Sequence, residues 1–254
     1  MRVFFEGRYR KFVRDLPQTV FFCHECKGRG KGCSHCGGYG KLTKDSVQEL
    51  LTRVAMPRFR ARRNKFHGAG REDVDVRMLG PGRPFVYEVL QPKNPRPDLE
   101  ELAGEVNRRY AERIEVLGLR WCGRERVAEV KGARQTKEYE AVIVPSAPLD
   151  GGVLRSLLGR RIEVVQRTPR RVAHRRADLE RRRWIEVVSC EPIEDGRWRL
   201  RIRSEHGTYI KEAISGEEGR TQPSVASLLG VACTCSELDV VGVYDEGAGG
   251  TPSG

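Results

Sequence analysis

Alternation of apolar and polar residues is the commonest pattern along this chain. Residues 1–18 alternate apolar with basic positions, which predicts a strand or a strand pair. A run at 74–78, bracketed by glycines, alternates in the same way. Further strand-like runs, bounded by Gly, Pro or Asp, occupy 137–144, 161–167, 184–190, 198–203, 207–210 and 237–244. Strands therefore outnumber helices, and we expect an α+β fold with a mainly antiparallel central sheet flanked by helices.

Two segments have the apolar spacing of a helix. The first begins at Ser46, a predicted N-cap, with Glu49 three residues later completing a capping box, and we expect Pro57 to end it. The second covers residues 97–117, where apolar residues recur at helical spacing. We divide the chain into N-terminal strands with a cysteine-rich segment (1–45), one large domain (46–244) and a tail (245–254) expected to be disordered.

The charge of the 254-residue chain favours a polyanionic partner. It has 47 basic and 35 acidic residues, a formal net charge of +12. Nucleic acid is the first candidate partner and an anionic membrane surface the second. No stretch approaches the roughly 20 apolar residues of a membrane span, and charged residues stand where a signal peptide has its apolar run. We therefore expect a cytoplasmic protein that binds nucleic acid and not a membrane.

Half of the eight cysteines lie in two adjacent copies of the unit C-x-x-C-x-G-x-G. Two such knuckles can close a tetrahedral site through four thiolates, and such a site leaves no position open for catalysis. The predicted ligands of a structural zinc ion are Cys23, Cys26, Cys33 and Cys36. The alternatives are disulfides or free thiols, and substitution by His24 or His35 as ligands.

The same unit resembles the zinc-binding repeats of the Hsp40 (DnaJ-type) chaperones. The resemblance covers residues 23–40 only, and the chain lacks that family's His-Pro-Asp tripeptide. We therefore interpret the segment as a structural element. Its basic residues offer charge to RNA, and they are Lys27, Arg29, Lys31 and Lys41.

Arginine is concentrated in two further segments. Ten arginines lie between Arg160 and Arg183, against three acidic residues. Because the guanidinium group suits bidentate binding of phosphate, we interpret this segment as an RNA-facing surface, with a solvated hairpin face as the alternative. The second basic patch, residues 58–65, precedes the segment Gly70–Arg77, in which acids and arginines alternate. This patch could bring a phosphate backbone close to Asp73.

Four segments together resemble one enzyme family. They are EGRYRKFVRDLPQT, FHGAGREDVDVRMLGPGRPFVYEV, QRTPRRVAHRRAD and HGTYIKEAISGEEGRTQPSVASLLG. From Arg8 to about Tyr244 the chain is similar to the archaeal and eukaryotic pseudouridine synthases that modify uridines fifty-four and fifty-five of the tRNA TΨC loop. The motifs Gly-Arg-x-Asp, Lys-x-Tyr-x-Ala and Gly-Thr-Tyr-Ile-basic also recur across the wider superfamily. The resemblance implies a pseudouridine synthase fold and a catalytic domain at 46–244, acting on tRNA without a cofactor.

The resemblance also implies roles for single residues. Asp73 corresponds to the family's nucleophile, which attacks C1′ or C6 of the uridine, and Lys211 to its basic partner. Tyr139 and Tyr209 match two substrate-site tyrosines, of which one stacks on the uracil and either can move a proton at C5. The target base must be flipped out of its loop.

Two further residues complete the implied substrate site. Arg71 precedes the nucleophile in the Gly-Arg-x-Asp motif, and Leu238 lies in a strand-like run where it would buttress the pocket. A surface strand with ion pairs is the alternative interpretation of Gly70–Arg77. The alternative for Tyr139 and Tyr209 is that both are core residues of the sheet, and the alternative for Leu238 is an ordinary core leucine.

Members of this family usually carry an additional N-terminal RNA-binding region of the THUMP type, which this sequence lacks. We expect a fragment or short form, or a separate protein that supplies the region. Two other functions remain open at this point. One is a non-catalytic zinc-knuckle protein that holds structured RNA. The other is a metal-assisted nucleic-acid hydrolase using Asp73 and Asp75, whose carboxylates would share one face of a strand. Asp75 is also the second candidate for the nucleophile.

Overall fold

The computed structural model describes residues 1–173 and 177–245, which form two compact units. The first unit is Met1–Ala133 and the second begins at Arg134. This boundary falls inside the segment 46–244 that the sequence analysis treats as one domain, and the cysteine segment belongs to the first unit. Apart from its first residue, the tail predicted to be disordered lies outside the described residues.

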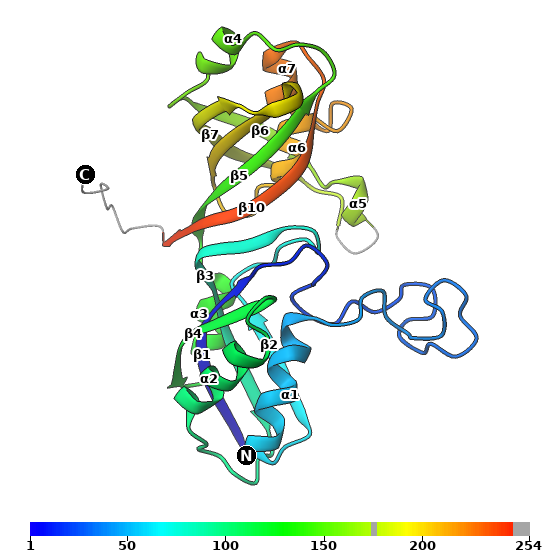
Figure 1. Ribbon diagram of the computed structural model, residues 1–254, viewed down its shortest axis with the longest axis vertical. Coiled ribbons are helices and arrows are strands. Elements are labelled where there is room, and N and C mark those ends of the chain that lie inside the picture. Colours follow the sequence, from blue (N-terminus) through cyan, green and yellow to red (C-terminus); the bar gives the residue numbers. More distant parts are fainter. Residues whose placement is uncertain (174–176, 246–254) are drawn as a thin grey trace. The chain divides into compact units, whose positions relative to one another are not determined.

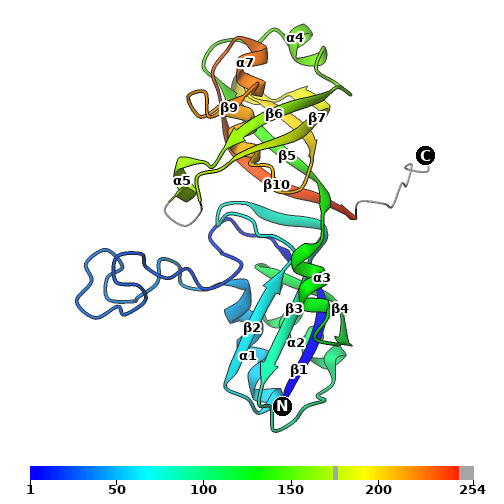
Figure 2. The same ribbon diagram turned by 180° about the vertical axis from the view of Figure 1, so that it is seen from behind.

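The first unit is an antiparallel sheet with helices on both faces. Its strands are β1 (Arg2–Lys11), β2 (Arg63–Gly68), β3 (Arg77–Leu90) and β4 (Ile114–Cys122), paired in the order β4-β1-β3-β2. Helices α1 (Val47–Phe59) and α2 (Leu99–Arg109) lie on one face and α3 (Arg126–Gly132) on the other (Figures 1 and 2). The predicted strand near the N-terminus is confirmed as β1. It occupies an inner position because Phe5 and Tyr9 are fully buried.

The predicted first helix is confirmed in its start and extended at its end. The Ser46 hydroxyl accepts a hydrogen bond from the Glu49 amide at 3.1 Å, as the capping box requires. The expected end at Pro57 is wrong, because α1 continues to Phe59. Phe59 is fully buried and its ring stacks on Phe5 at 5.8 Å, so packing keeps the last turn helical despite the proline.

The predicted second helix is too long. Only Leu99–Arg109 is helical, and the chain from Ile114 pairs with β1 as strand β4. The side chain of Asn107 both accepts from the Val116 amide and donates to the Val116 carbonyl, which ties the strand to the helix. Pairing with a buried strand therefore overrides the helical spacing of the apolar residues.

The second unit is a six-stranded antiparallel sheet in the order β10-β5-β8-β7-β6-β9. Its strands are β5 (Gln135–Pro145), β6 (Arg161–Arg167), β7 (Glu180–Pro192), β8 (Trp198–Ser204), β9 (Thr221–Gln222) and β10 (Cys233–Asp245). Its short helices are α4 (Gly151–Arg155), α5 (Arg170–Ala173), α6 (Ile210–Ser215) and α7 (Val225–Leu229), with a 3₁₀ turn at Glu194–Gly196. Helix α6 packs against β10 and β6. The α+β class with mainly antiparallel pairing is confirmed in both units.

Two of the predicted strands are not strands. Residues 207–210 form a turn that leads into α6, because Gly207 has a φ of +74° and the Tyr209 backbone is bound by a side chain instead of a strand. Residues 69–76 are irregular, and β3 begins only at Arg77. The Val76 amide donates to the Asp73 carbonyl at 3.2 Å, which closes a turn. The argument that Asp73 and Asp75 share a strand face is therefore wrong.

Within residues 1–173 and 177–245, none of the helices combines the length and apolar character needed to cross a bilayer.

Candidate functional site

The four predicted zinc ligands lie together in the first unit. Their Sγ atoms are all within 4.8 Å of one another, and Cys23–Cys33 and Cys26–Cys36 are 3.9 and 3.8 Å apart. Thiolates that each lie about 2.3 Å from one tetrahedral ion are about 3.8 Å apart, so the spacing fits a Cys₄ zinc site. His24 and His35 are outside this cluster and contact each other. In the described part of the chain, this is the one group of three or more such side chains that could hold a metal.

Glycines shape both knuckles. The Gly30 and Gly40 amides donate to the Sγ atoms of Cys26 and Cys36 at 3.3 and 3.2 Å. The Gly30 amide lowers the pKa of the Cys26 thiol to about 7, whereas burial and the neighbouring thiols of Cys26 and Cys33 raise the pKa of Cys23 to about 11. Both glycines have positive φ, and a Cβ on Gly30 would lie 2.4 Å from the Gly38 carbonyl oxygen. The repeated glycines are therefore required by the turn.

The residues predicted for catalysis are divided between the two units. Arg71 and Asp73 lie in the first unit, on the irregular segment 69–76 between β2 and β3. Arg71 is exposed and Asp73 is partly buried. The four other residues lie in the second unit and are Tyr139, Tyr209, Lys211 and Leu238.

Three buried side chains bind the backbone of the segment that carries Asp73. Gln18 donates to the Gly70 carbonyl at 3.0 Å, and Arg83 Nη1 donates to the Ala69 carbonyl at 2.7 Å. Lys11 Nζ donates to the carbonyls of Asp73 and Val74 at 3.1 and 2.9 Å. The segment has no regular secondary structure, so these contacts take the place of a hydrogen-bonded ladder.

Glu72, the residue before Asp73, points into the core of the first unit. Its carboxylate forms an ion pair with Arg83 Nε at 2.8 Å, and the two side chains are 1% and 2% exposed. The Tyr9 hydroxyl donates to both Glu72 oxygens at 2.7 and 2.9 Å, and it accepts from Gln18. Burial raises the pKa of Tyr9 well above its usual value, and the Glu72 charge adds to this rise. Tyr9 therefore acts as a neutral donor.

In the second unit, Tyr139 and Leu238 lie on one face of the sheet. The β5–β10 register pairs Tyr139 with Val240 and Ala141 with Leu238, so the two residues are diagonal neighbours on adjoining strands. Leu238 is 5% exposed and Tyr139 is partly buried. The structure therefore brings together two of the residues that the family resemblance assigned to the substrate site.

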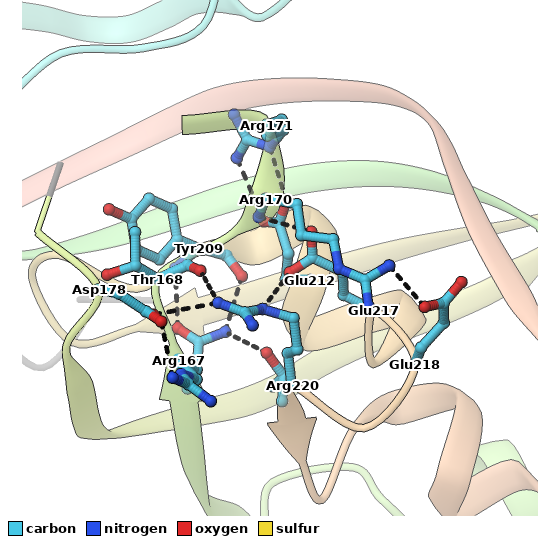
Figure 3. A network of polar contacts seen from close by, with 12 residues as sticks. Arg167, Thr168, Arg170, Arg171, Asp178, Tyr209, Glu212, Glu217, Glu218 and Arg220 are labelled. Carbon is cyan, nitrogen blue, oxygen red and sulfur yellow. Dashed lines mark hydrogen bonds and ion pairs between the residues drawn. The ribbon is translucent and has the colours of Figure 1, made fainter. Parts of the chain in front are cut away.

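Tyr209 and Lys211 stand at the start of α6, where Tyr209 is the N-cap residue. The buried side chain of Gln166 binds the Tyr209 backbone twice, accepting from its amide at 3.0 Å and donating to its carbonyl at 2.9 Å. The Arg171 guanidinium lies 5.9 Å from the centre of the Tyr209 ring (Figure 3). Arg171 is in turn paired with Glu212, at 2.6 and 3.2 Å.

Acidic residues form ion pairs with several arginines of the arginine-rich segment in the second unit (Figure 3). Asp178 pairs with Arg167 at 2.7 Å and with Arg220 at 3.1 Å. The bond from Arg167 is the main reason that the pKa of Asp178 is lowered. Arg170 pairs with Glu218 at 2.6 Å. Residues 212–218 supply carboxylates in addition to the three acids within the segment, so part of the segment's positive charge is already balanced.

Sequence reasoning missed the residues that position these groups. They are Lys11, Glu72 and Arg83 in the first unit, and Gln166, Arg171 and Glu212 in the second. All six lie inside the segments that carried the family resemblance. That location was the available signal, but Lys11 lies 62 positions from Asp73, Gln166 lies 43 from Tyr209 and Arg171 lies 41 from Glu212, so no local pattern joins them.

Comparison with known proteins shows the family to which the chain belongs. The family model described as "Pus10, C-terminal" matches residues 4–244, and the chain belongs to this family. Curated relatives then give the particular proteins that it is similar to. A protein from Methanopyrus kandleri is 43% identical over 96% of this chain and 57% of its own length. A second, from Methanothermobacter marburgensis, is 46% identical over 95% of this chain and 60% of its own. Both are named tRNA pseudouridine synthase Pus10.

These relatives are longer proteins. The chain spans little more than half the length of the first curated relatives that it matches. Among solved structures, a Cbf5-Nop10-Gar1 complex has a TM-score of 0.43 and 20% sequence identity, covering 79% of this chain and 46% of that chain.

Proposed function

We propose that this chain is a tRNA pseudouridine synthase that isomerises uridine in the TΨC loop, at positions fifty-four, fifty-five or both. The observation that carries the proposal is the family match over residues 4–244, together with relatives that are all named tRNA pseudouridine synthases. Its partner is tRNA, to which a net charge of +12 is suited. A further RNA-binding region, on this protein or on a separate one, would assist docking. We expect the enzyme in the cytoplasm.

The reaction exchanges one bond to the ribose for another. The N1–C1′ bond breaks, the base turns, C1′ bonds to C5, C5 gives up its proton, and N1 takes one up. Atoms and electrons balance, so the chemistry needs no cofactor. Asp73 is the proposed nucleophile, attacking C1′ or C6 and leaving again when the new bond is complete. Lys211 is assigned as the basic partner of the nucleophile, a role that rests on the family resemblance alone.

The tyrosines and two neighbours would handle the base. Tyr139 or Tyr209 would stack on the flipped uracil, and either hydroxyl could take part in proton transfer at C5. Leu238 would support the pocket, and its position on the same sheet face as Tyr139 supports this role. Arg71 is exposed on the same segment as Asp73 and would contact the RNA.

Zinc has a structural role in this proposal. Cys23, Cys26, Cys33 and Cys36 would hold the ion through four thiolates, which fits their spacing and leaves no coordination position for substrate. The ion would fix the fold of the segment and supply no chemistry to the isomerisation.

Mapping of pseudouridine tests the function and the nucleophile together. An unmodified tRNA transcript is incubated with the protein, treated with carbodiimide, and read by stops in reverse transcription. We expect stops in the TΨC loop with the unaltered chain and none with Asp73→Asn, while tRNA affinity stays within about twofold. Asp15→Asn, an exposed carboxylate of the same unit, is the matched control and should keep activity.

Three outcomes would contradict parts of the proposal. Normal turnover by Asp73→Asn excludes Asp73 as the nucleophile, and loss of turnover in Asp75→Asn alone would transfer the role to Asp75. Tight tRNA binding without any pseudouridine, even when a THUMP-type region is added, indicates a non-catalytic RNA-binding protein. Cleavage of the tRNA backbone that requires Mg²⁺ would indicate a hydrolase.

A further inference from the structure

The ammonium group of Lys11 is enclosed by backbone carbonyls of the segment that carries Asp73. Lys11 is the last residue of β1 and is fully buried. Its Nζ donates to the carbonyls of Leu16, Val74 and Asp73 at 2.7, 2.9 and 3.1 Å. A protonated amine has three N–H donors, and here each has an acceptor. A neutral amine has only two, so it would leave one of these carbonyls without its donor.

The backbone is held on both sides of the candidate nucleophile. On one side the Glu72 side chain is fixed by Arg83 and by the Tyr9 hydroxyl, in the core of the first unit. On the other side Lys11 binds the carbonyl of Asp73 itself and that of Val74. Asp73 nevertheless stays partly exposed. This arrangement fixes the main chain of the residue and leaves its side chain able to meet a ligand.

We propose that Lys11 is a positioning residue for Asp73, acting through its ammonium group on the carbonyls of Asp73 and Val74. The inference rests on the proposed function, because it assigns Lys11 to the same reaction. Lys11 does not touch the substrate in this account. Its contribution is the placement of the attacking carboxylate, and a misplacement of about 1 Å can lower a rate roughly 100-fold.

The protonation of Lys11 gives the proposal a distinctive pH dependence. The charged groups around its ammonium are Glu72, Asp73, Asp75 and Arg83. Its partners on the neighbouring strands, Ile114 and Met78, are apolar. Burial lowers the pKa of Lys11 to about 8, although the three carboxylates oppose this effect. The ammonium therefore loses its proton as the pH rises through about 8, and the rate of pseudouridine formation should fall over the same range.

Two variants of Lys11 and one control test the proposal in the full chain. Lys11→Met removes the donors, and we expect kcat to fall about 100-fold while the Kd for tRNA changes less than about twofold. Lys11→Arg keeps a positive charge at every accessible pH, so any activity that it retains should show no alkaline decline up to pH 9. Lys93→Met replaces an exposed lysine of the same unit and should behave as the unaltered chain does.

Hydrogen exchange supplies a readout that does not depend on activity. In Lys11→Met the amides of residues 70–76 should exchange at least about tenfold faster, while those of β3 keep their protection. An unchanged kcat in Lys11→Met overturns the proposal, as does an alkaline decline in Lys11→Arg that coincides with that of the unaltered chain. If the unaltered chain makes no pseudouridine, the proposed function has failed. Unchanged exchange at 70–76 in Lys11→Met then overturns the Lys11 contact separately.

Discussion

Glu72 and Arg83 form an ion pair that is almost completely removed from water. Removing one partner of such a buried pair is costly, because the remaining charge stays away from water and has lost its counter-charge. Arg83→Met should therefore destabilise the first unit by about 3–5 kcal/mol. The measurement is guanidinium unfolding followed by Trp121 fluorescence, with Trp184 and Trp198 of the second unit replaced by Phe.

A double variant separates the ion pair from general packing. Glu72→Met combined with Arg83→Met removes both charges of the pair, so it should cost less than the sum of the two single changes. Strict additivity would show that the two side chains do not interact through their charges.

The Gln166 side chain fixes the start of α6 through two hydrogen bonds to the backbone of Tyr209. Gln166→Leu keeps the volume and removes both bonds, so Tyr209 should lose its fixed position at the start of α6. We expect kcat for pseudouridine formation to fall about tenfold with tRNA affinity nearly unchanged. A KM that rises with an unaltered kcat would instead assign Tyr209 to binding alone.

At the scale of elements, the cysteine segment has a small core of its own within the first unit. Its buried residues form a cluster of their own, Cys23, Cys26 and Cys36, packed against Cys33 and Leu42. We expect about one zinc ion per chain by elemental analysis of the purified protein. Cys33→Ser should lose the ion yet leave the unfolding transition of the sheet within about 1 kcal/mol, because that core does not include the segment.

Cys190→Ser is the matched control for the zinc prediction. Cys190 lies on β7 in the second unit, and the variant should retain the full metal content. A Cys33→Ser chain that keeps its zinc would contradict the assignment of the ligand set.

Elements were predictable from the sequence where their causes are local. The start of α1 follows from Ser46 and Glu49, three positions apart, and the strands β6 and β8 follow from alternation alone. The start of β3 was not predictable. Val74 and Val76 alternate as a strand would, but Lys11 and a turn at Asp73 hold this stretch out of the sheet.

The candidate site shows the same division. The four cysteines from Cys23 to Cys36 are close in the chain, so their spacing alone was sufficient to find the cluster that the structure contains. Asp73 and Tyr209 came only from family resemblance. Gln166 and Lys11 hold their partners across more than 40 positions of chain, and such contacts exist only after the sheet has formed.

At the scale of the whole molecule, the net charge of +12 predicts that tRNA binding depends strongly on salt. Binding releases counterions from the RNA, so affinity should fall roughly tenfold or more between about 50 and 200 mM salt. Arg182→Ala, an exposed arginine of β7, should reduce the slope of log K against log salt by about 1. Arg124→Ala, an exposed arginine of the first unit, is the control. Equal slopes for the two variants would remove β7 from the RNA-binding surface.

The inner position of β1 has a consequence for the synthesis of the protein. Residues 2–11 are made before both of their partner strands, β3 and β4, and the last pairing reaches Cys122. The cysteine knuckles, by contrast, need only residues 23–40 and can close on a metal while translation continues. The order of folding is therefore the reverse of the order of emergence at this end of the chain. For the time needed to make about 110 residues, Phe5 and Tyr9 have no sheet to enter, and during that interval this stretch of the nascent chain is open to aggregation.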